Sequence, residues 1–531
     1  MINITRKMCG IWAWIHNHRQ SRSNLMMNGV RFLEARGPEG TRFVDVSGAT
    51  MAFTRLAING LNDLGMQPFM TQKYIWMCNG EIYNSMELQH TLSYSPESGS
   101  DCEILGKLWE TVKDAKAFAR ALDGVFAIVL YEVSTSSWLI ARDPYGVRPL
   151  FWSFNHFSGW MFASERKALE GFSSAKIYEF PPGEVWRIKG VDCVREVYHT
   201  VPWIKAPWSG PDELRIALTE AVRKRVNSTE RPVAALLSGG LDSSLICALV
   251  QRLLVESRRL PLQTFSIGMA GSSDLKFAKM VAEYIGSNHT ELIVTADEMF
   301  DCIPEVIRDI ESYDITSVRA SVGNWLIARH IREKTDCKVV FNGDGSDEVF
   351  GSYLYFYKAP SDYEFESESQ RLLQEIHKYD VLRSDRCISS HGLEARTPYL
   401  DKQFVAVAMG LPTGLRRPIR GIRVEKKCLR DAFVGYLPDE VLWRKKEAFS
   451  DGVSSTERPW YEEIQMRVNI EDDWKTISGK FEEPKPLTPE AYYYRKIYES
   501  HYKNTGEFMQ FWMPKWSPET TDPSAKTLVG V

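Results

Sequence analysis

The chain has 531 residues, a length that suggests two to four domains rather than a single hydrophobic core. Hydrophobic residues make up 44% and charged residues 25%, which is typical of a folded globular protein and excludes a largely disordered chain. A net charge of -4 and the lack of a long apolar run give no reason to expect nucleic acid or a membrane as a partner.

Short apolar or alternating runs separated by turn residues fill the chain up to about residue 200. This pattern is typical of antiparallel sheet. Strands are predicted at 41–46, 74–77, 125–131, 138–141, 160–163 and 185–188, and helices at 25–35 and 102–111. We therefore predict a sheet-rich domain at 9–200.

A different pattern follows residues 201–210, where two prolines and a terminal glycine predict a linker. Strands are predicted at 233–237, 264–267 and 338–341, in alternation with helices at 244–254 and 274–285. Such alternation predicts an α/β domain with a parallel sheet that helices cover on both faces. We place this domain at 211–513 and expect a flexible, polar tail at 514–531.

The nine cysteines are scattered, without a C-x-x-C pair or a short His/Cys metal spacing. We therefore expect reduced thiols and a cytoplasmic protein. The apolar stretch at 10–15 follows positively charged residues, but it is too short for the core of a signal peptide.

The string S-G-G-L-D-S-S at 238–244 lies between a predicted apolar strand and a predicted helix. Glycines let backbone N–H groups approach a phosphate, and the helix N-terminus adds a positive dipole end. The string lacks the Gly-Lys-Ser/Thr ending of kinase-type loops, so pyrophosphate suits it better than γ-phosphoryl transfer. It resembles the loop of the ATP-pyrophosphatase group, and Asp242 is a candidate ligand for Mg²⁺.

Cys9 begins a second ordered set of motifs, whereas an isolated cysteine would more often be a small buried residue. The set continues with R-G-P-E at 36–39, R-L-A-I at 55–58, N-G-E-I-Y-N at 79–84, S-D-C-E at 100–103, D-G-V-F at 123–126 and A-R-D-P-Y-G-V-R-P-L at 141–150. In this order the strings resemble the N-terminal-nucleophile (Ntn) glutaminase domain, an αββα sandwich.

That resemblance implies a role for each residue. The Cys9 thiolate would attack the glutamine amide, and its own α-amino group would act as the base if Cys9 were the first residue. The Asn79 side chain and the Gly80 N–H would form the oxyanion hole. The implied glutamine-binding residues are Arg55, Ile58, Asn79, Gly80, Glu81 and Asp101.

The second half carries further strings: Y-D-I-T at 313–316, G-D-G-S-D-E-V-F-G at 343–351, H-K-Y-D at 377–380, G-L-E-A-R-T-P-Y-L-D at 392–401 and K-E-A-F-S-D-G-V at 446–453. With them, the chain resembles the glutamine-hydrolysing asparagine synthetase family along nearly its whole length. The implied reaction activates aspartate with Mg-ATP as β-aspartyl-AMP, and ammonia from glutamine then travels through an internal tunnel and gives asparagine, AMP and pyrophosphate.

The same resemblance implies the synthetase site. The implied ATP-binding residues are Leu237, Ser238, Gly239, Gly240, Asp242, Ser243, Ser244, Ile267, Asn342, Gly343 and Lys446. Asp242 and Asp347 would hold Mg²⁺, Asp344 would be catalytic, and Glu394 and Arg396 would position aspartate. The small-molecule partners would be glutamine, aspartate and ATP, and related enzymes suggest a homodimer.

Three features depart from the family pattern. The residues before Cys9 would have to be absent for the glutaminase mechanism, through a start at Met8 or proteolysis, unless the enzyme uses free ammonia. Asp344 stands where the family has glutamate, which retracts the carboxylate by about 1.5 Å. Milder changes are Asn342 for serine, Arg386 for lysine and His391 for tryptophan.

Three alternatives stay open. One is a related amidotransferase with another carboxylate acceptor, and another is an ammonia-dependent synthetase. The third is a catalytically impaired homologue that binds the same ligands, because displaced catalytic groups can cost about 100-fold in rate. A tRNA-modifying ATP-pyrophosphatase is disfavoured by the acidic balance of the chain.

Overall fold

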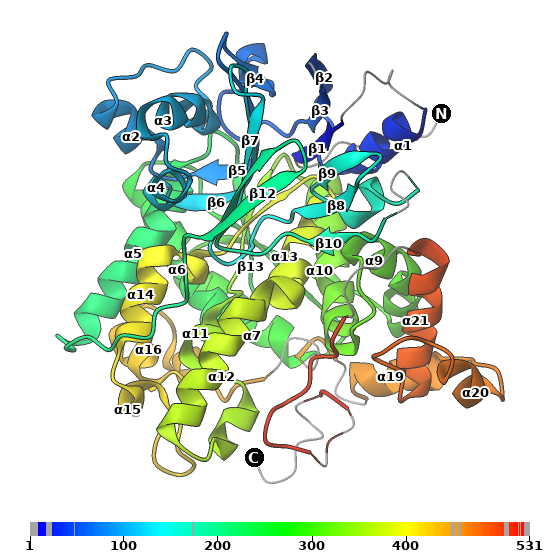
Figure 1. The fold of residues 1–531 in the computed structure, drawn as a ribbon. Coiled ribbons are helices and arrows are strands. Elements are labelled where there is room, and N and C mark those ends of the chain that lie inside the picture. The colour runs from blue at the N-terminus through cyan, green and yellow to red at the C-terminus, as the bar shows by residue number, and fades with distance from the viewer. Residues whose placement is uncertain are drawn as a thin grey trace.

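The computed structural model describes residues 9–16, 24–46, 48–171, 175–447, 452–454, 458–503, 509–518, 520 and 522–524. Residues 1–8, which bear on whether Cys9 is exposed, lie outside this part, as do 519, 521 and 525–531 of the expected tail. Figure 1 shows a sheet-rich half that contains the N-terminal strands, set against a half in which long helices dominate. In the part of the chain described, no helix has the length and apolar character needed to cross a membrane.

Two antiparallel sheets of six strands each form the first half. The strand order of the first sheet is β10 (Tyr178–Glu179), β8 (Phe151–Asn155), β9 (Gly159–Ala163), β1 (Gly10–Ile15), β3 (Ala49–Thr54) and β2 (Thr41–Val46). The order of the second is β12 (Asp192–Val197), β11 (Glu184–Lys189), β7 (Ser137–Arg142), β6 (Gly124–Glu132), β5 (Tyr74–Ile82) and β4 (Phe69–Met70). All six predicted strands are present.

Alternating side chains of β1 divide the first half into layers. Ile11 and Ala13 belong to the core between the two sheets, whereas Trp12 and Trp14 belong to the core that α1 covers. This period-2 pattern is typical of a strand with packed layers on both faces. The outer helices are α1 (Asn24–Leu33) on the first sheet, and α2 (Ser85–Thr91), α3 (Ile104–Val112) and α4 (Ala115–Ala121) on the second. The predicted αββα sandwich is confirmed.

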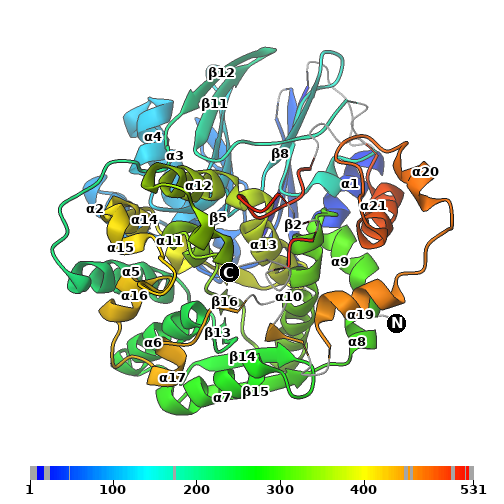
Figure 2. The ribbon, with the colours of Figure 1, turned by 90° about the horizontal axis from the view of Figure 1, so that it is seen from below.

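A parallel sheet of five strands organises the second half (Figure 2). Its order is β15 (Asn288–Ile293), β14 (Gln263–Gly268), β13 (Val233–Leu236), β16 (Val339–Phe341) and β17 (Glu394–Arg396). Val233 and Ala235 face one apolar cluster and Ala234 faces the other, so both faces of β13 are covered. The predicted parallel α/β arrangement is confirmed.

Helices cover this sheet on both sides. One side carries α5 (Pro211–Asn227), α6 (Leu241–Glu256), α7 (Ser273–Ile285), α11 (Ser346–Phe350), α14 (Lys402–Gly410), α16 (Lys427–Ala432) and α17 (Asp439–Leu442). The other carries α8 (Ala296–Asp301), α9 (Ile303–Ile310), α10 (Ile315–Lys334), α13 (Asp380–Ser389), α19 (Trp460–Arg467) and α21 (Pro489–His501). The other α-helices in the described ranges are α12 (Asp362–Glu375), α15 (Thr413–Arg416) and α20 (Trp474–Ser478).

The two halves meet through buried charges. Arg36, which has no exposed surface, lies 2.9 Å from an Asp385 carboxylate oxygen and 3.0 Å from a Glu165 carboxylate oxygen. Arg148 reaches the same Asp385 at 3.2 Å. Because Asp385 lies on α13 and both arginines come from the sheet-rich half, these ion pairs join the halves in a region shielded from solvent.

The segment expected to be a flexible tail contacts the second half where the structure describes it. The Trp516 ring lies 5.9 Å from the rings of Tyr355 and Phe356. Asp522 accepts two hydrogen bonds of 2.8 Å from Arg319 on α10. These contacts hold the described part of residues 514–524 against the helices around the parallel sheet.

The buried ion pairs predict a large effect of Asp385→Asn. Removal of this charge leaves Arg36 and Arg148 partly uncompensated, so we expect a loss of about 3–5 kcal/mol in the free energy of unfolding. Burial opposes ionisation of Asp385, but Arg36 and Arg148 outweigh it and lower the pKa of the carboxyl. This stabilisation is therefore present at neutral pH and is lost as the pH falls through the folded-state value. Urea denaturation between pH 3 and pH 7 measures both effects.

Asp431→Asn is the matched control. Asp431 pairs with Lys427 one turn away on the surface of α16, and such exposed pairs contribute about 0.5 kcal/mol or less. Equal destabilisation by the two variants would contradict the importance of the buried interface.

Candidate active sites

Cys9 directly precedes β1 in the sheet-rich half. Its thiol lies 3.2 Å from both the N–H and the carbonyl oxygen of Leu56, and Arg36 donates a 3.0 Å hydrogen bond to its carbonyl oxygen. Burial raises the pKa of this thiol to about 12. A neutral thiol is a weak nucleophile, so reaction at Cys9 requires a base that removes the proton during attack.

The predicted oxyanion residues lie on β5. The Asn79 side-chain amide lies 3.4 Å from the Ser164 hydroxyl, and Ser164 also accepts a 2.9 Å bond from Ile11 N on β1. At Gly80 an added Cβ would lie 2.0 Å from the Val125 carbonyl oxygen, so only glycine fits. The sheet pairing thus fixes the backbone at the position where the resemblance expects the oxyanion donor.

Two predicted glutamine-binding carboxylates are buried close to this site. Burial raises the pKa of Glu81, and nearby Asp101 and Glu394 raise it further. Burial also raises the pKa of Asp101, although a 2.6 Å hydrogen bond from Ile82 N opposes this. A bound ammonium group would favour the ionised form of both acids, which suits the α-ammonium of an amino acid.

The other two predicted glutamine-binding residues already have protein partners. Arg55 donates hydrogen bonds of 2.5 and 2.9 Å to the Gly60 and Asn62 carbonyl oxygens. Ile58 is buried, and its carbonyl oxygen accepts from Glu230 N at 3.1 Å. The carbonyl contacts hold the Arg55 guanidinium on the loop that ends at Asn62.

A cavity of about 250 Å³ opens in the second half at the carboxyl ends of β13, β14 and β16. This is where parallel sheets bind ligands, because strand order reverses beside β13. Eleven residues predicted for ATP, Mg²⁺ or catalysis line it: Leu237, Ser238, Gly240, Asp242, Ser243, Ile267, Asn342, Gly343, Asp344, Asp347 and Lys446. The glycine loop and the 342–347 segment, which are about 100 residues apart in sequence, therefore come together at this cavity.

The glycine loop is folded tightly at the start of α6. The Ser238 and Ser243 hydroxyl oxygens lie 3.0 Å apart, and Ser243 Oγ accepts a 3.2 Å bond from Ser238 N. Gly239 has a φ of +72°, and an added Cβ would lie 2.5 Å from Ala278 N. Gly239 and Ser244 do not line the cavity; they shape the turn and the first turn of α6 behind it.

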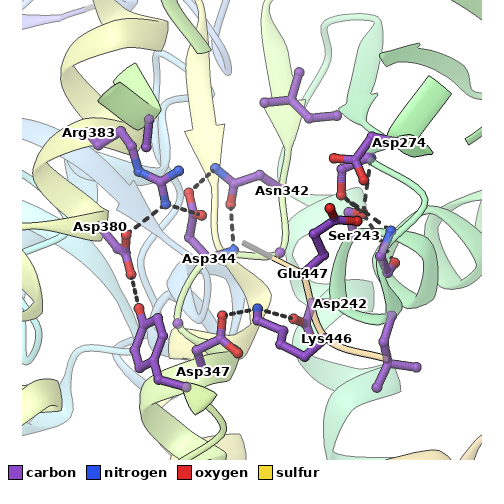
Figure 3. Close-up of a pocket in the computed structure, with 18 of the residues that line it drawn as sticks. Asp242, Ser243, Asp274, Asn342, Asp344, Asp347, Asp380, Arg383, Lys446 and Glu447 are labelled. Atoms are coloured by element: carbon purple, nitrogen blue, oxygen red, sulfur yellow. Dashed lines mark hydrogen bonds and ion pairs between the residues drawn. The ribbon is translucent and has the colours of Figure 1, made fainter. Parts of the chain in front are cut away.

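Two lysines and two aspartates form a cluster of ion pairs in the cavity, and Figure 3 shows Lys446 of this cluster between Asp242 and Asp347. Lys426 Nζ lies 2.5 Å from Asp242 and 2.7 Å from Asp347, and Lys446 Nζ lies 2.5 Å from Asp347. Burial by itself would raise the pKa of Asp347, but these two lysines outweigh burial and hold the pKa far below its usual range. Two cations beside a glycine loop and a helix N-terminus provide positive charge for a polyphosphate.

The donor set fits Mg²⁺ that arrives with a nucleotide. Asp242 and Asp347 share both lysines, so their carboxylates face the same point. No cluster of three or more His, Cys, Asp or Glu suited to a metal ion occurs in the described part of the chain. Mg²⁺ is commonly held by one or two carboxylates together with phosphate oxygens, which matches this pair.

Lys426 is the main cavity residue that the sequence did not reveal. It lies in no recognised string, and only the structure marks it, with a backbone φ of +55° that is unusual for a lysine. Other cavity-lining residues missed are Asp274, Arg383 and Arg444. Arg444 donates to the Gly239 carbonyl oxygen at 3.1 Å and to Asp274 at 3.1 Å, and so holds the 444–447 segment on the glycine loop.

Glu394 and Arg396, expected to position aspartate, do not line this cavity. Arg396 is completely buried and bonds Glu394 at 2.6 Å, the Ser228 hydroxyl at 2.6 Å and Glu81 at 3.4 Å. Only the family resemblance placed them in the site. They instead carry the charge network that runs between the two halves, next to the glutamine-binding acids.

Two of the departures from the family pattern also lie away from the cavity. Arg386 is buried between Glu311, at 3.6 Å, and the ring of Phe151, at 5.4 Å. His391 packs edge-on against the Trp325 ring at 4.5 Å. Neither lines the cavity, so these substitutions affect packing at α13. Asn342 and Asp344, in contrast, both line it.

Comparison with known proteins identifies both halves. A family model described as Asparagine synthase matches residues 213–369 and 360–526, and one described as Glutamine amidotransferase domain matches residues 8–194. Asparagine synthetase (glutamine-hydrolyzing) of Mus musculus is 40% identical over 561 residues, covering 98% of each chain. The proteins of the same name from Gallus gallus and Bos taurus are 40% and 39% identical, again over 98% of each chain.

These matches extend over both candidate sites, and the relatives are covered almost from end to end. The chain belongs to the glutamine-hydrolysing asparagine synthetase family.

Proposed function

We propose that this chain is a glutamine-dependent asparagine synthetase, a carbon–nitrogen ligase that converts aspartate, ATP, glutamine and water into asparagine, AMP, pyrophosphate and glutamate. The observation that carries the proposal is the pairing of two sites in one chain. The Cys9 thiol lies close enough to the buried Glu81 to interact with its charge, and Lys426 and Lys446 line one cavity with the glycine loop. The names of the relatives favour this function over another carboxylate acceptor.

At the glutaminase site, the Cys9 sulfur attacks the side-chain amide carbon of glutamine, and ammonia leaves. Water then hydrolyses the resulting thioester, which releases glutamate and restores the thiol. The raised pKa of the thiol means that a base must take its proton, and the α-amino group of an N-terminal Cys9 is the base nearest to it. The Asn79 amide and the Gly80 N–H stabilise the oxyanion, a contribution of about 3–4 kcal/mol in comparable enzymes. Glu81 and Asp101 hold the α-ammonium.

At the synthetase site, the backbone at Leu237 and Ile267 holds adenine, and the loop around Ser238 and Ser243 holds pyrophosphate. Mg²⁺, held by Asp242 and Asp347, would neutralise phosphate charge. Lys426 and Lys446 stabilise the negative charge that moves onto pyrophosphate as the aspartate carboxylate attacks the α-phosphorus. The resulting aspartyl carbon is then open to attack by ammonia.

Ammonia has to pass from Cys9 to the cavity as the uncharged molecule. One apolar cluster crosses the boundary: Leu56, Val125 and Val147 of the first half join Leu245 and Leu400 of the second. Such a lining disfavours protonation of ammonia on its way. The proposal also includes the domain division, with a glutaminase domain at 9–200, a linker at 201–210, a synthetase domain at 211–513 and a tail at 514–531.

The setting of the enzyme also belongs to the proposal. All nine cysteines are free thiols, which supports a reducing, cytoplasmic location. The net charge of -4 supports small-molecule substrates rather than nucleic acid. A homodimer is proposed from the resemblance, and light scattering after size-exclusion chromatography measures it.

Asparagine formation with glutamine and with ammonium, measured side by side, tests both sites. In Cys9→Ala we expect glutamine-dependent synthesis to fall at least about 1,000-fold, because the nucleophile is lost, while ammonium-dependent synthesis stays within about twofold. Cys193→Ala, on the edge strand β12, is the matched control and should retain both activities. Glutamine-dependent synthesis by Cys9→Ala would contradict the assigned nucleophile.

The N-terminus of the active protein gives a separate test. We expect glutaminase-active protein to have an intact mass that corresponds to Cys9 as its first residue. Its glutaminase rate should rise with pH through the titration of an α-amino group, at about pH 7.7–8.0. Full glutaminase activity in protein that retains residues 1–8 would rule out the α-amino base.

Lys426→Met tests the charge assignment in the cavity. Without the Lys426 cation, we expect ammonium-dependent asparagine formation and ATP–pyrophosphate exchange to fall about 100-fold or more, because charge on pyrophosphate is less stabilised. Lys427, one residue along, is half-exposed and lies beside Asp431 and 5.4 Å from the centre of the Trp443 ring, so Lys427→Met should be near wild type. Similar losses in the two variants would refute a specific role of Lys426.

A further inference from the structure

Asn342 makes an unusual set of contacts at the end of β16. Its side-chain amide nitrogen donates to an Asp344 carboxylate oxygen at 2.9 Å and to the Ser384 hydroxyl at 2.5 Å. Its side-chain oxygen lies 3.4 Å from the Asp344 N–H. Its own backbone N–H donates to Arg396 O at 3.1 Å, which anchors the residue to β17. A single side chain thus contacts both the backbone and the carboxylate of Asp344.

The other Asp344 oxygen is held from the opposite side. Arg383 on α13 lies 3.0 Å from it and 2.8 Å from Asp380, and Asp380 accepts a 2.5 Å hydrogen bond from the Tyr353 hydroxyl. Figure 3 shows Asp344 between Asn342 and Arg383 at the cavity wall. With each carboxylate oxygen fixed by a different element, Asp344 has little freedom to change rotamer.

Asn342 and Asp344, the two cavity residues that depart from the family pattern, are hydrogen-bonded to each other. The resemblance expects glutamate at 344 and serine at 342, whereas this chain has a shorter acid and a longer neighbour. Aspartate loses one methylene, about 1.5 Å of reach, and serine has no amide to donate across the turn. The longer side chain therefore supplies the donor that the shorter acid needs.

We propose that Asn342 is a positioning residue, which holds the shortened carboxylate of Asp344 in its working place and makes 342 and 344 a co-adapted pair. The inference rests on the proposed function, in which Asp344 serves the synthetase reaction. It predicts that the effects of substitution at the two positions depend on each other. Two independent residues would instead give multiplicative effects on rate.

The test compares Asn342→Ser, Asp344→Glu and the double variant, with ammonium as nitrogen donor so that Cys9 is not involved. Each single variant should lower kcat about 10- to 100-fold, with the KM for ATP within about threefold. The double variant should be at least about tenfold more active than the product of the two single effects predicts. Thermal unfolding of each variant checks that the fold is retained.

The pH profile separates positioning of Asp344 from a general packing effect. The amide donor favours the ionised carboxylate, so its loss raises the pKa of a group that burial already raises. The acidic limb of the kcat profile in Asn342→Ser should therefore move to higher pH. Asn324→Ser is the matched control, because Asn324 is the other asparagine that lines the cavity. It should leave the acidic limb of the kcat profile unmoved. Its effect on kcat should multiply with the effect of Asp344→Glu.

Multiplicative effects in the 342–344 cycle, or an unmoved acidic limb in Asn342→Ser, would overturn the inference. A crystal structure of Asn342→Ser gives a reading that needs no turnover: a rotated Asp344 carboxylate supports positioning by Asn342, and an unmoved one refutes it. A wild-type protein that forms no asparagine from ammonium would refute the proposed function, and the crystal structure would still decide the role of Asn342.

Discussion

The buried contact between Arg36 and Asp385 fixes the relation between the two sites. Arg36 reaches Asp385 of the second half while its Nε holds the Cys9 carbonyl oxygen at 3.0 Å. A charge without exposed surface needs a partner, because an unpaired one costs several kcal/mol. The two halves therefore cannot separate without exposing Arg36, and Cys9 is tied to α13, the helix that also carries Arg383.

The parallel sheet explains why the cavity combines distant parts of the sequence. Its strands place the ends of β13, β14 and β16 at one edge, so the glycine loop and the 342–347 segment meet there. Lys426 and Lys446 arrive from segments after the sheet is complete and pair with Asp242 and Asp347. Each of these lysines is balanced by a carboxylate, and a nucleotide bound as proposed would exchange these contacts for contacts with phosphate and metal.

Much of this arrangement could be predicted from local sequence. The apolar strand before S-G-G-L-D-S-S and the alternation of strands and helices predicted the parallel sheet, because both signals are short-range. The strand at 10–15 was not predicted, because its residues are apolar on both faces. It therefore lacks the alternation of apolar and polar residues that marks a strand with one exposed face. Lys426 and the interface position of Arg396 could not be predicted, since both depend on contacts between residues more than 150 positions apart.

The contacts of the C-terminal segment have a consequence for how the enzyme is made. Trp512, Pro523 and Ser524 line the same cavity as Leu236, so its wall spans nearly 300 residues of chain. Domains generally fold in order as the chain leaves the ribosome. The sheet-rich half is complete in sequence by β12, whereas the cavity lacks part of its wall until Pro523 and Ser524 have been added. Loss of Trp512, Pro523 and Ser524 would therefore open the cavity without removing any strand of the parallel sheet.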